Sequence, residues 1–164
     1  AAMNPCPCGF LTDPQKECVC TPLQIQRYRS KVSGPLLDRV DIQIEVPTLR
    51  YQELATKDAG ESSEIIRQRV NAARVRQLRR FDKTKLHSNA QMGTREIKRH
   101  CAVNDDAERL LETAINKLGL SARAYSRVLK VGRTIADLVG SDDILASHIA
   151  EAIQYRSLDR AVFY

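Results

Sequence analysis

The sequence predicts a mainly α-helical protein in which a helical bundle follows the tail of an α/β core. The chain has 164 residues, of which 43% are hydrophobic, only 5% are aromatic and none is Trp, so Leu, Ile, Val and Ala must form the core. Apolar side chains recur at helical spacing within residues 62–158. Residues 41–46 alternate polar and apolar side chains instead, which predicts a short strand with one buried face.

The first third of the chain is predicted to hold a loop followed by two short helical pieces. Pro and Gly interrupt residues 6–20, so we expect that loop there. Thr21 is placed to cap a helix over residues 22–32, which begins with Pro, a residue tolerated at the first helical position. A helical turn is expected over residues 35–39. Residues 48–60 are expected to form a short helix or turn and then a polar linker.

Five helices are predicted after the linker. Ser62 or Ser63 is positioned to cap a long helix that extends to about Phe81, and a polar connection follows over residues 82–91. The remaining four helices are expected over residues 95–101, 105–118, 121–139 and 143–156. Together these helices are expected to form a bundle with its own core.

The four later helices have residue types typical of helix ends. Thr94, Asn104 and Ser121 lie where an N-cap side chain is expected to accept a hydrogen bond from the first turn. Gly119 and Gly140 are expected to end two of these helices, because glycine readily adopts the left-handed conformation that terminates a helix.

Four of the five cysteines form two close pairs, Cys6 with Cys8 and Cys18 with Cys20. A tetrahedral zinc site needs four such soft ligands at about 2.3 Å from the metal, and a loop with too few apolar residues to form a core has few other reasons to be ordered. Two disulfides and an iron–sulfur cluster are the alternatives, and cytosolic thiols stay reduced. We predict a structural zinc site, with Cys101 as a separate buried thiol.

A single arginine, Arg39, lies between the predicted helical turn and the predicted strand. A guanidinium presented on such a turn can reach across a subunit interface and spread the charge of a γ-phosphate over its planar fork. The alternative is a local ion pair, in which Asp38 or Asp41 neutralises Arg39. Spacing alone does not separate the two interpretations.

Positive charge is concentrated in residues 62–100, which contain eleven Lys or Arg and three acidic residues, whereas the whole chain has a formal net charge of +6. The formal net charge of this segment is therefore +8, and that of the rest of the chain is −2. Arginines on the long helix could bind DNA phosphates, or they could form a solvated helix face without the aromatic residues typical of a stacking site. These arginines are Arg67, Arg69, Arg74, Arg76, Arg79 and Arg80.

Five runs of residues, in order over nearly the whole chain, resemble the ComM branch of the magnesium chelatase-like AAA+ ATPases. The runs are residues 3–9 (MNPCPCG), 34–39 (GPLLDR), 118–125 (LGLSARAY), 133–138 (RTIADL) and 149–156 (IAEAIQYR). The resemblance implies the remnant of an AAA+ α/β core with a cysteine loop over residues 1–54. A linker and a long inserted helix would then occupy residues 55–93, and a helical AAA+ lid residues 94–164.

The resemblance also implies roles for three polar residues. Asn4 matches the sensor 1 residue, which helps to orient the attacking water beside the γ-phosphate. Arg39 matches the arginine finger, which acts in trans on the nucleotide of a neighbouring subunit. Arg123 matches the sensor 2 arginine of the lid, which contacts nucleotide phosphate. The structural alternatives are a turn residue for Asn4 and a surface arginine for Arg123.

The family binds ATP through G-x4-G-K-[ST] and holds Mg²⁺ with an acidic strand, and neither motif occurs in this sequence. We therefore expect the chain alone to be inactive, whereas the intact protein is expected to bind ATP and Mg²⁺ in a homohexameric ring. The resemblance implies a DNA branch-migration helicase of natural transformation. The alternatives are the ATPase subunit of magnesium chelatase itself, a zinc-stabilised nucleic-acid-binding module and a plain helical interaction domain.

The sequence offers no segment suited to a membrane. No apolar run approaches the roughly 18–20 residues that span a bilayer. The start of the chain lacks the basic and apolar regions typical of a signal peptide. We therefore expect a cytoplasmic protein with no membrane partner.

Overall fold

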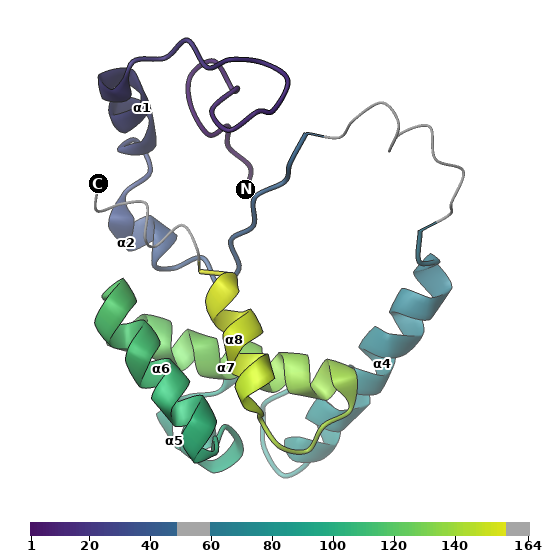
Figure 1. Cartoon of the computed structure of the whole chain (residues 1–164). Helices are drawn as coiled ribbons and strands as arrows, with labels where there is room; N and C mark the ends of the chain where they lie inside the picture. Colours follow the sequence, from purple (N-terminus) through teal and green to yellow (C-terminus); the bar gives the residue numbers. More distant parts are fainter. Residues whose placement is uncertain (49–59, 157–164) are drawn as a thin grey trace.

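The computed structural model describes residues 1–48 and 60–156, and nearly all regular structure in these ranges is helical (Figure 1). An isolated parallel bridge between Val103 and Ile144 is the β-pairing found there. No helix in this part of the chain combines the length and the apolar character needed to cross a bilayer. The helices are α1 (Pro22–Arg29), α2 (Gly34–Leu37), α4 (Ser63–Arg80), the 3₁₀ helix η1 (Asn89–Gln91), α5 (Thr94–His100), α6 (Asp105–Leu118), α7 (Ala122–Val139) and α8 (Ala146–Gln154). The predicted mainly helical fold is confirmed.

Helix α7 is the centre of the bundle. It packs against α4, α5, α8 and η1, and α6 packs against α8 (Figure 1). Its buried residues include Leu129, Ile135 and Ala136, so one face of the helix is enclosed. Gly132 lies at the closest approach to α8, where an added Cβ would stand 2.8 Å from Cδ1 of Ile149. Because that separation leaves no room for a side chain, glycine lets the two helices pack closely.

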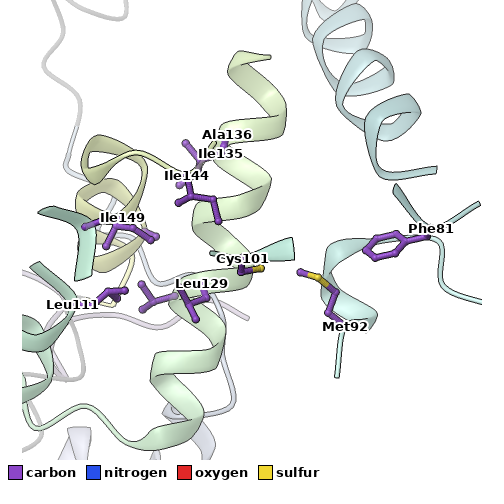
Figure 2. Packing of buried hydrophobic residues seen from close by; sticks show 12 residues of the cluster. Phe81, Met92, Cys101, Leu111, Leu129, Ile135, Ala136, Ile144 and Ile149 are labelled. Atoms are coloured by element: carbon purple, nitrogen blue, oxygen red, sulfur yellow. The ribbon is translucent and has the colours of Figure 1, made fainter. Parts of the chain in front are cut away.

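The main apolar core joins α7 to segments that are distant in the sequence (Figure 2). Ile144 and Ile149 pack in one cluster with Leu129 of α7 and Leu111 of α6. Phe81, which directly follows α4, belongs to the same cluster and is almost completely buried. Full burial of one such side chain stabilises the folded state by about 1.5–3 kcal/mol, so this cluster is the main source of the bundle's stability.

A buried polar network connects α4 to α7. Asp137 of α7 is 2% exposed, and its two carboxylate oxygens accept hydrogen bonds of 2.7 and 2.5 Å from Arg80 of α4. Burial by itself raises the pKa of Asp137. Hydrogen bonds from Arg80 and Asn89 and the charges of Arg80 and Arg133 lower it by more, so the pKa lies below its ordinary value. A depressed carboxyl pKa contributes stability that is present at neutral pH and lost as the pH falls below about 4.

Most of the predicted helix ends are confirmed. Ser62, Asn104 and Ser121 each accept a hydrogen bond from the backbone N–H three residues later, and so cap α4, α6 and α7. Gly119 and Gly140 end α6 and α7 with φ angles of 62° and 80°, in the left-handed region that favours glycine.

Several predicted ends are wrong by one to three residues. Helix α1 stops at Arg29 rather than at residue 32. The N-cap of α5 is Gly93 and not Thr94, because the side chain of Glu96 accepts the Gly93 N–H at 2.9 Å and takes over the capping role. Helix α8 starts at Ala146 rather than at residue 143, because the preceding segment forms the isolated β-bridge.

The predicted strand over residues 41–46 is also wrong. The segment pairs with no strand within the described ranges, and a strand depends on such a partner for its backbone hydrogen bonds. Gln43 is 5% exposed, whereas Ile44 and Val46 are 64% and 82% exposed. The N–H of Gln43 donates at 2.7 Å to the carbonyl of Tyr155, just after α8. Gln43 is therefore the one buried residue of the segment, and a polar side chain rather than the apolar face meets the bundle.

The segment before the linker is built from short local elements. Thr21 accepts a hydrogen bond from the N–H of Gln24 and caps α1 as predicted. Nε of Arg29, the last residue of α1, donates to the carbonyl of Pro5 at 3.2 Å and ties the helix to the cysteine loop. The short helix or turn predicted within residues 48–60 lies almost wholly outside the described residues.

Replacing Asp137 with Ala should lower the free energy of unfolding by about 3–5 kcal/mol, because Arg80 and Arg133 would lose their shared counter-ion in a buried site. Asp142→Ala is the matched control. Asp142 pairs with Arg76, which lies on α4 like Arg80. Because the side chain of Asp142 is 95% exposed, the loss of unfolding free energy should stay below about 1 kcal/mol. Urea unfolding followed by circular dichroism measures both variants. Equal losses would contradict a stabilising role for the network.

Residues 62–158 are expected to be the stable unit of the chain, because the continuous apolar core lies within them. Limited trypsin digestion should therefore cut within the first 60 residues before it cuts within residues 105–156. Mass spectrometry of the earliest fragments identifies the cut sites. Early cleavage inside α6, α7 or α8 would show that the bundle is not the most stable part.

Candidate functional site

The four paired cysteines converge in the N-terminal loop. Their Sγ atoms all lie within 4.8 Å of one another, and Sγ of Cys6 lies 3.4 Å from that of Cys8 and 3.7 Å from that of Cys18. Four sulfurs bound tetrahedrally to zinc at about 2.3 Å would be about 3.8 Å apart, whereas a disulfide needs about 2.05 Å. All four are free thiols. The disulfide alternative is therefore wrong, and the donor set fits a soft metal ion such as zinc.

Local turns hold the thiols in this arrangement. The N–H of Gly9 donates to the carbonyl of Cys6 at 3.1 Å, and Gly9 has a φ of 84°, which glycine adopts without strain. Oδ1 of Asp13 accepts hydrogen bonds of 2.7 and 3.0 Å from the N–H groups of Gln15 and Lys16. The turn at Gly9 holds Cys6 and Cys8 close together, and the turn at Asp13 brings the chain back towards Cys18 and Cys20.

The thiols of the cluster differ in their pKa values. A backbone hydrogen bond from Phe10 lowers the pKa of Cys8 to about 6, from an ordinary value of 9.0. Burial, together with side-chain hydrogen bonds with Cys8 and Cys6, raises the pKa of Cys20 to about 12. The pKa of Cys6 is also lowered, whereas that of Cys18 is raised, so two thiols ionise more easily and two resist because negative charges would accumulate. A divalent cation would supply the compensating charge and favour the thiolate form of all four.

Arg39 follows the one-turn helix α2 and has an exposed side chain. Its Nη1 donates at 2.7 Å to the carbonyl of Pro35. No carboxylate of the described residues pairs with it, because Asp38 and Asp41 form ion pairs with arginines of the bundle. The local ion-pair interpretation of Arg39 is therefore wrong, and its guanidinium faces solvent without a counter-ion in the described part of the chain.

Arg123 lies in the first turn of α7 and contacts the residue before Arg39. Its Nη1 is 3.4 Å from Oδ2 of Asp38, and Oγ of Ser121 donates to Oδ1 of the same carboxylate at 2.9 Å. Ser121 also caps α7, so the cap and the ion pair fix the position of this helix end. Arg123 and the Arg39 segment therefore occupy the same edge of the molecule.

Two further arginines bind the backbone of this segment. Nη1 of Arg127, on α7, donates at 2.7 Å to the carbonyl of Arg39, and its guanidinium also pairs with Asp41. Nη1 of Arg156, just after α8, donates at 3.0 Å to the carbonyl of Val40. The sequence pattern predicts a role for neither residue. A spacing of four residues puts Arg127 on the same helix face as Arg123, and this spacing could have indicated a shared role. The burial of Arg156 depends on tertiary packing, which the sequence pattern does not show.

Asn4 lies apart from these arginines. Its side chain is exposed in the cysteine loop, and Nδ2 is 3.8 Å from the position that a Cβ on Gly9 would take. Within the described residues, no hydrogen bond joins Asn4 to Arg39 or Arg123. The structure thus brings Arg123 beside the Arg39 segment and leaves Asn4 beside the cysteines.

Most of the positive charge on α4 is compensated within the chain. Arg74 donates to Oε1 of Gln77 at 3.1 Å, and Arg79 makes no side-chain hydrogen bond or ion pair with described residues. The other four arginines pair with carboxylates: Arg67 with Glu64, Arg69 with Glu61, Arg76 with Asp142 and Arg80 with Asp137. This pairing favours a solvated, structurally engaged helix over a surface dedicated to DNA phosphates.

Two family models match this sequence. The model for the C-terminal part of magnesium chelatase subunit ChlI matches residues 60–156, and the model for magnesium chelatase subunit ChlI matches residues 1–54. Because the first match alone covers more than half of the chain, the chain belongs to the magnesium chelatase family. The helical bundle described above is thus the C-terminal domain of that family.

The relatives define the branch within the family. Competence protein ComM of Haemophilus influenzae is 47% identical over 161 residues, which are 98% of this chain and 30% of that protein. The YifB proteins of Salmonella typhimurium and Escherichia coli are 43% and 42% identical, and each match covers 100% of this chain and 31% of the relative. The chain is therefore a member of the ComM branch, as predicted, and spans about 30% of the length of these relatives.

Replacing Cys18 with Ser should lower the bound zinc of the purified chain from about one ion per chain to a small fraction, because three sulfurs do not complete a tetrahedral site. Atomic absorption or mass spectrometry under native conditions measures the ratio. Cys101→Ala is the matched control, because Cys101 lies in the bundle core and should not affect the metal. Unchanged zinc in the Cys18 variant would rule out this ligand set.

Proposed function

We propose that this chain supplies the arginine finger and the sensor 2 lid of a ComM-type AAA+ ATPase that acts on DNA. The observation that carries the proposal is the exposed guanidinium of Arg39, which has no carboxylate partner among the described residues and lies at the edge that Arg123 also occupies. The family membership supports the same assignment. In the intact protein this edge would face the nucleotide of a neighbouring subunit in a hexameric ring.

Arg39 would act on the γ-phosphate of that neighbour. As water attacks the phosphorus and the bond to the bridging oxygen breaks, negative charge spreads over the phosphoryl oxygens and the leaving oxygen. A planar guanidinium can donate two parallel hydrogen bonds to such oxygens. Arginine fingers contribute about 10³–10⁵-fold to kcat in related phosphoryl transfers.

Arg123 would contact a phosphate of the same nucleotide. It is ion-paired with Asp38, whose Cα lies about 3.8 Å from that of the next residue, Arg39. The pair is partly exposed, and its 3.4 Å separation is long for a charge-assisted hydrogen bond. A phosphate oxygen could therefore replace Asp38 as the partner of Arg123 at little cost.

The other elements of an AAA+ ATPase are only partly present in this chain. The sequence has no G-x4-G-K-[ST] motif, so the chain alone should not hydrolyse ATP, and ATP and Mg²⁺ would bind in the intact protein. Asn4 as sensor 1 rests on its place in the resemblance. Zinc in the four-cysteine loop would have a structural role, because four sulfur ligands leave no open coordination position.

DNA as the partner is supported by the competence protein among the relatives and by the +8 charge of residues 62–100. A metal-inserting ATPase, like the magnesium chelatase subunit that gives the family its name, is the second candidate. It is favoured by the ion-paired arginines of α4, which leave little uncompensated charge for DNA. A zinc-stabilised DNA-binding module would instead predict tight, salt-sensitive DNA binding by this chain alone.

The test is DNA-stimulated ATP hydrolysis by the full-length protein with and without Arg39→Ala. We expect DNA to stimulate the wild type and the substitution to lower kcat at least about hundredfold, because the γ-phosphate loses its trans partner. Arg27→Ala, which removes an exposed arginine from α1, is the matched control and should retain activity. Mixing the Arg39 variant with a variant inactive in its ATP-binding loop should restore part of the activity, since each supplies what the other lacks.

Each failure has a distinct meaning. ATPase activity that DNA does not stimulate would favour the metal-inserting ATPase. Full activity of Arg39→Ala would show that Arg39 is not a finger. Loss of activity without recovery in mixed rings would show that Arg39 acts within its own subunit or only supports folding.

A further inference from the structure

Arg127 and Arg156 have no part in the function proposed above, yet they bind two successive carbonyls of the chain, those of Arg39 and Val40. We propose that these two arginines are positioning residues, which dock residues 38–41 onto the helical bundle, so that the direction of the Arg39 side chain follows the lid. The inference rests on the proposed role of Arg39 as a finger.

The docking contacts reach the backbone, so they fix the path of the chain as well as its charge. Arg127 donates to the carbonyl of Arg39 at 2.7 Å, and Arg156 donates to the carbonyl of Val40 at 3.0 Å. The N–H groups of the same two residues donate to α2. That of Arg39 donates to the carbonyl of Leu36 and that of Val40 to the carbonyl of Leu37, both at 3.0 Å. The main chain at Arg39 is therefore held from both sides, while its side chain extends to solvent.

Carboxylates on either side of Arg39 strengthen the docking. Asp41 pairs with Arg127, and Oδ1 of Asp38 lies 3.6 Å from Nη2 of Arg156. Hydrogen bonds that involve ionised groups are roughly twice as strong as neutral ones. Both carboxylates of the segment thus bind the bundle and leave Arg39 as the unpaired charge of residues 38–41.

The two anchors belong to the rigid part of the molecule. Arg156 is 1% exposed, and its N–H donates to the carbonyl of Ile153 at 3.0 Å, a residue packed against the apolar core. Arg127 precedes the buried Val128 on α7, the central helix. Because both anchors are fixed to α7 and α8, a rotation of the lid would carry residues 38–41 with it and re-aim the finger.

Arg127 is the residue to test, because its side chain is 24% exposed and its loss should leave the bundle folded, whereas Arg156→Ala would open the core. In the full-length protein, Arg127→Ala should lower kcat for ATP by about tenfold to hundredfold, since a shift of about 1 Å in a catalytic group costs that much. KM should change less than about twofold, because ground-state binding of ATP does not involve this residue.

A structural readout accompanies the kinetics. Hydrogen–deuterium exchange of peptides covering residues 35–44 should accelerate about tenfold in Arg127→Ala, as expected when charged hydrogen bonds to the backbone are lost. Arg109→Ala, an exposed arginine of α6, is the matched control and should change neither exchange nor kcat. The conservative substitution Arg127→Lys should recover part of both, because it keeps a cationic side chain that can donate to the carbonyl of Arg39 and pair with Asp41.

Three results would overturn the inference. Unchanged exchange in Arg127→Ala would show that Arg127 does not dock the segment. Faster exchange with unchanged kcat, while Arg39→Ala is inactive, would show that docking does not orient the finger. If Arg39→Ala keeps full activity, the finger assignment fails and the orienting role fails with it, whereas the exchange data still decide whether the docking contact exists.

Discussion

Burial of α7 is the constraint on which the rest of the structure depends. This helix is enclosed by α4, α5 and α8, and Gly132 lets α8 approach to a distance that no side chain would allow. Once its apolar face is fixed, the ends of the helix are fixed as well. One end holds Arg123 and Arg127 towards residues 38–41, and the other holds Asp137, which receives Arg80 from α4. The packing of a single helix thus sets the geometry of both polar regions.

The two polar regions are built in opposite ways. The carboxylate of Asp137 is fully enclosed and is shared by Arg133, whose side chain is 4% exposed, and Arg80, whose side chain is 15% exposed, so removing it leaves two poorly hydrated charges without a partner. The ion pair between Asp38 and Arg123 is partly exposed, so Arg123 can exchange it for another partner at small cost. A stable contact between α4 and α7 and an exchangeable contact at the Arg39 edge would suit the lid role proposed for this bundle.

The cysteine loop is independent of this bundle. Its order comes from short-range turns at Gly9 and Asp13 and from four sulfurs that converge within metal-binding distance, and it needs no apolar core. A structural metal is an efficient way to order such a loop, because the binding free energy becomes folding free energy. The loop is tied to α1 by the hydrogen bond from Arg29 to Pro5, and so it can influence the path of the chain towards α2 and Arg39.

The sequence by itself determined the elements that local chemistry controls. Caps at Ser62, Asn104 and Ser121 and stops at Gly119 and Gly140 follow from hydrogen bonds within a few residues, and the cysteine pairs follow from donor type and spacing. Tertiary structure alone decided which face of each segment is buried. Residues 41–46 alternate as a strand would, yet the polar Gln43 faces the bundle, because its partner is a carbonyl far along the chain. The same is true of Asp38 and Asp41, whose obvious neighbour was Arg39. They pair with Arg123 and Arg127 instead, since the packing of α7 brings those charges within reach and no local pattern records that contact.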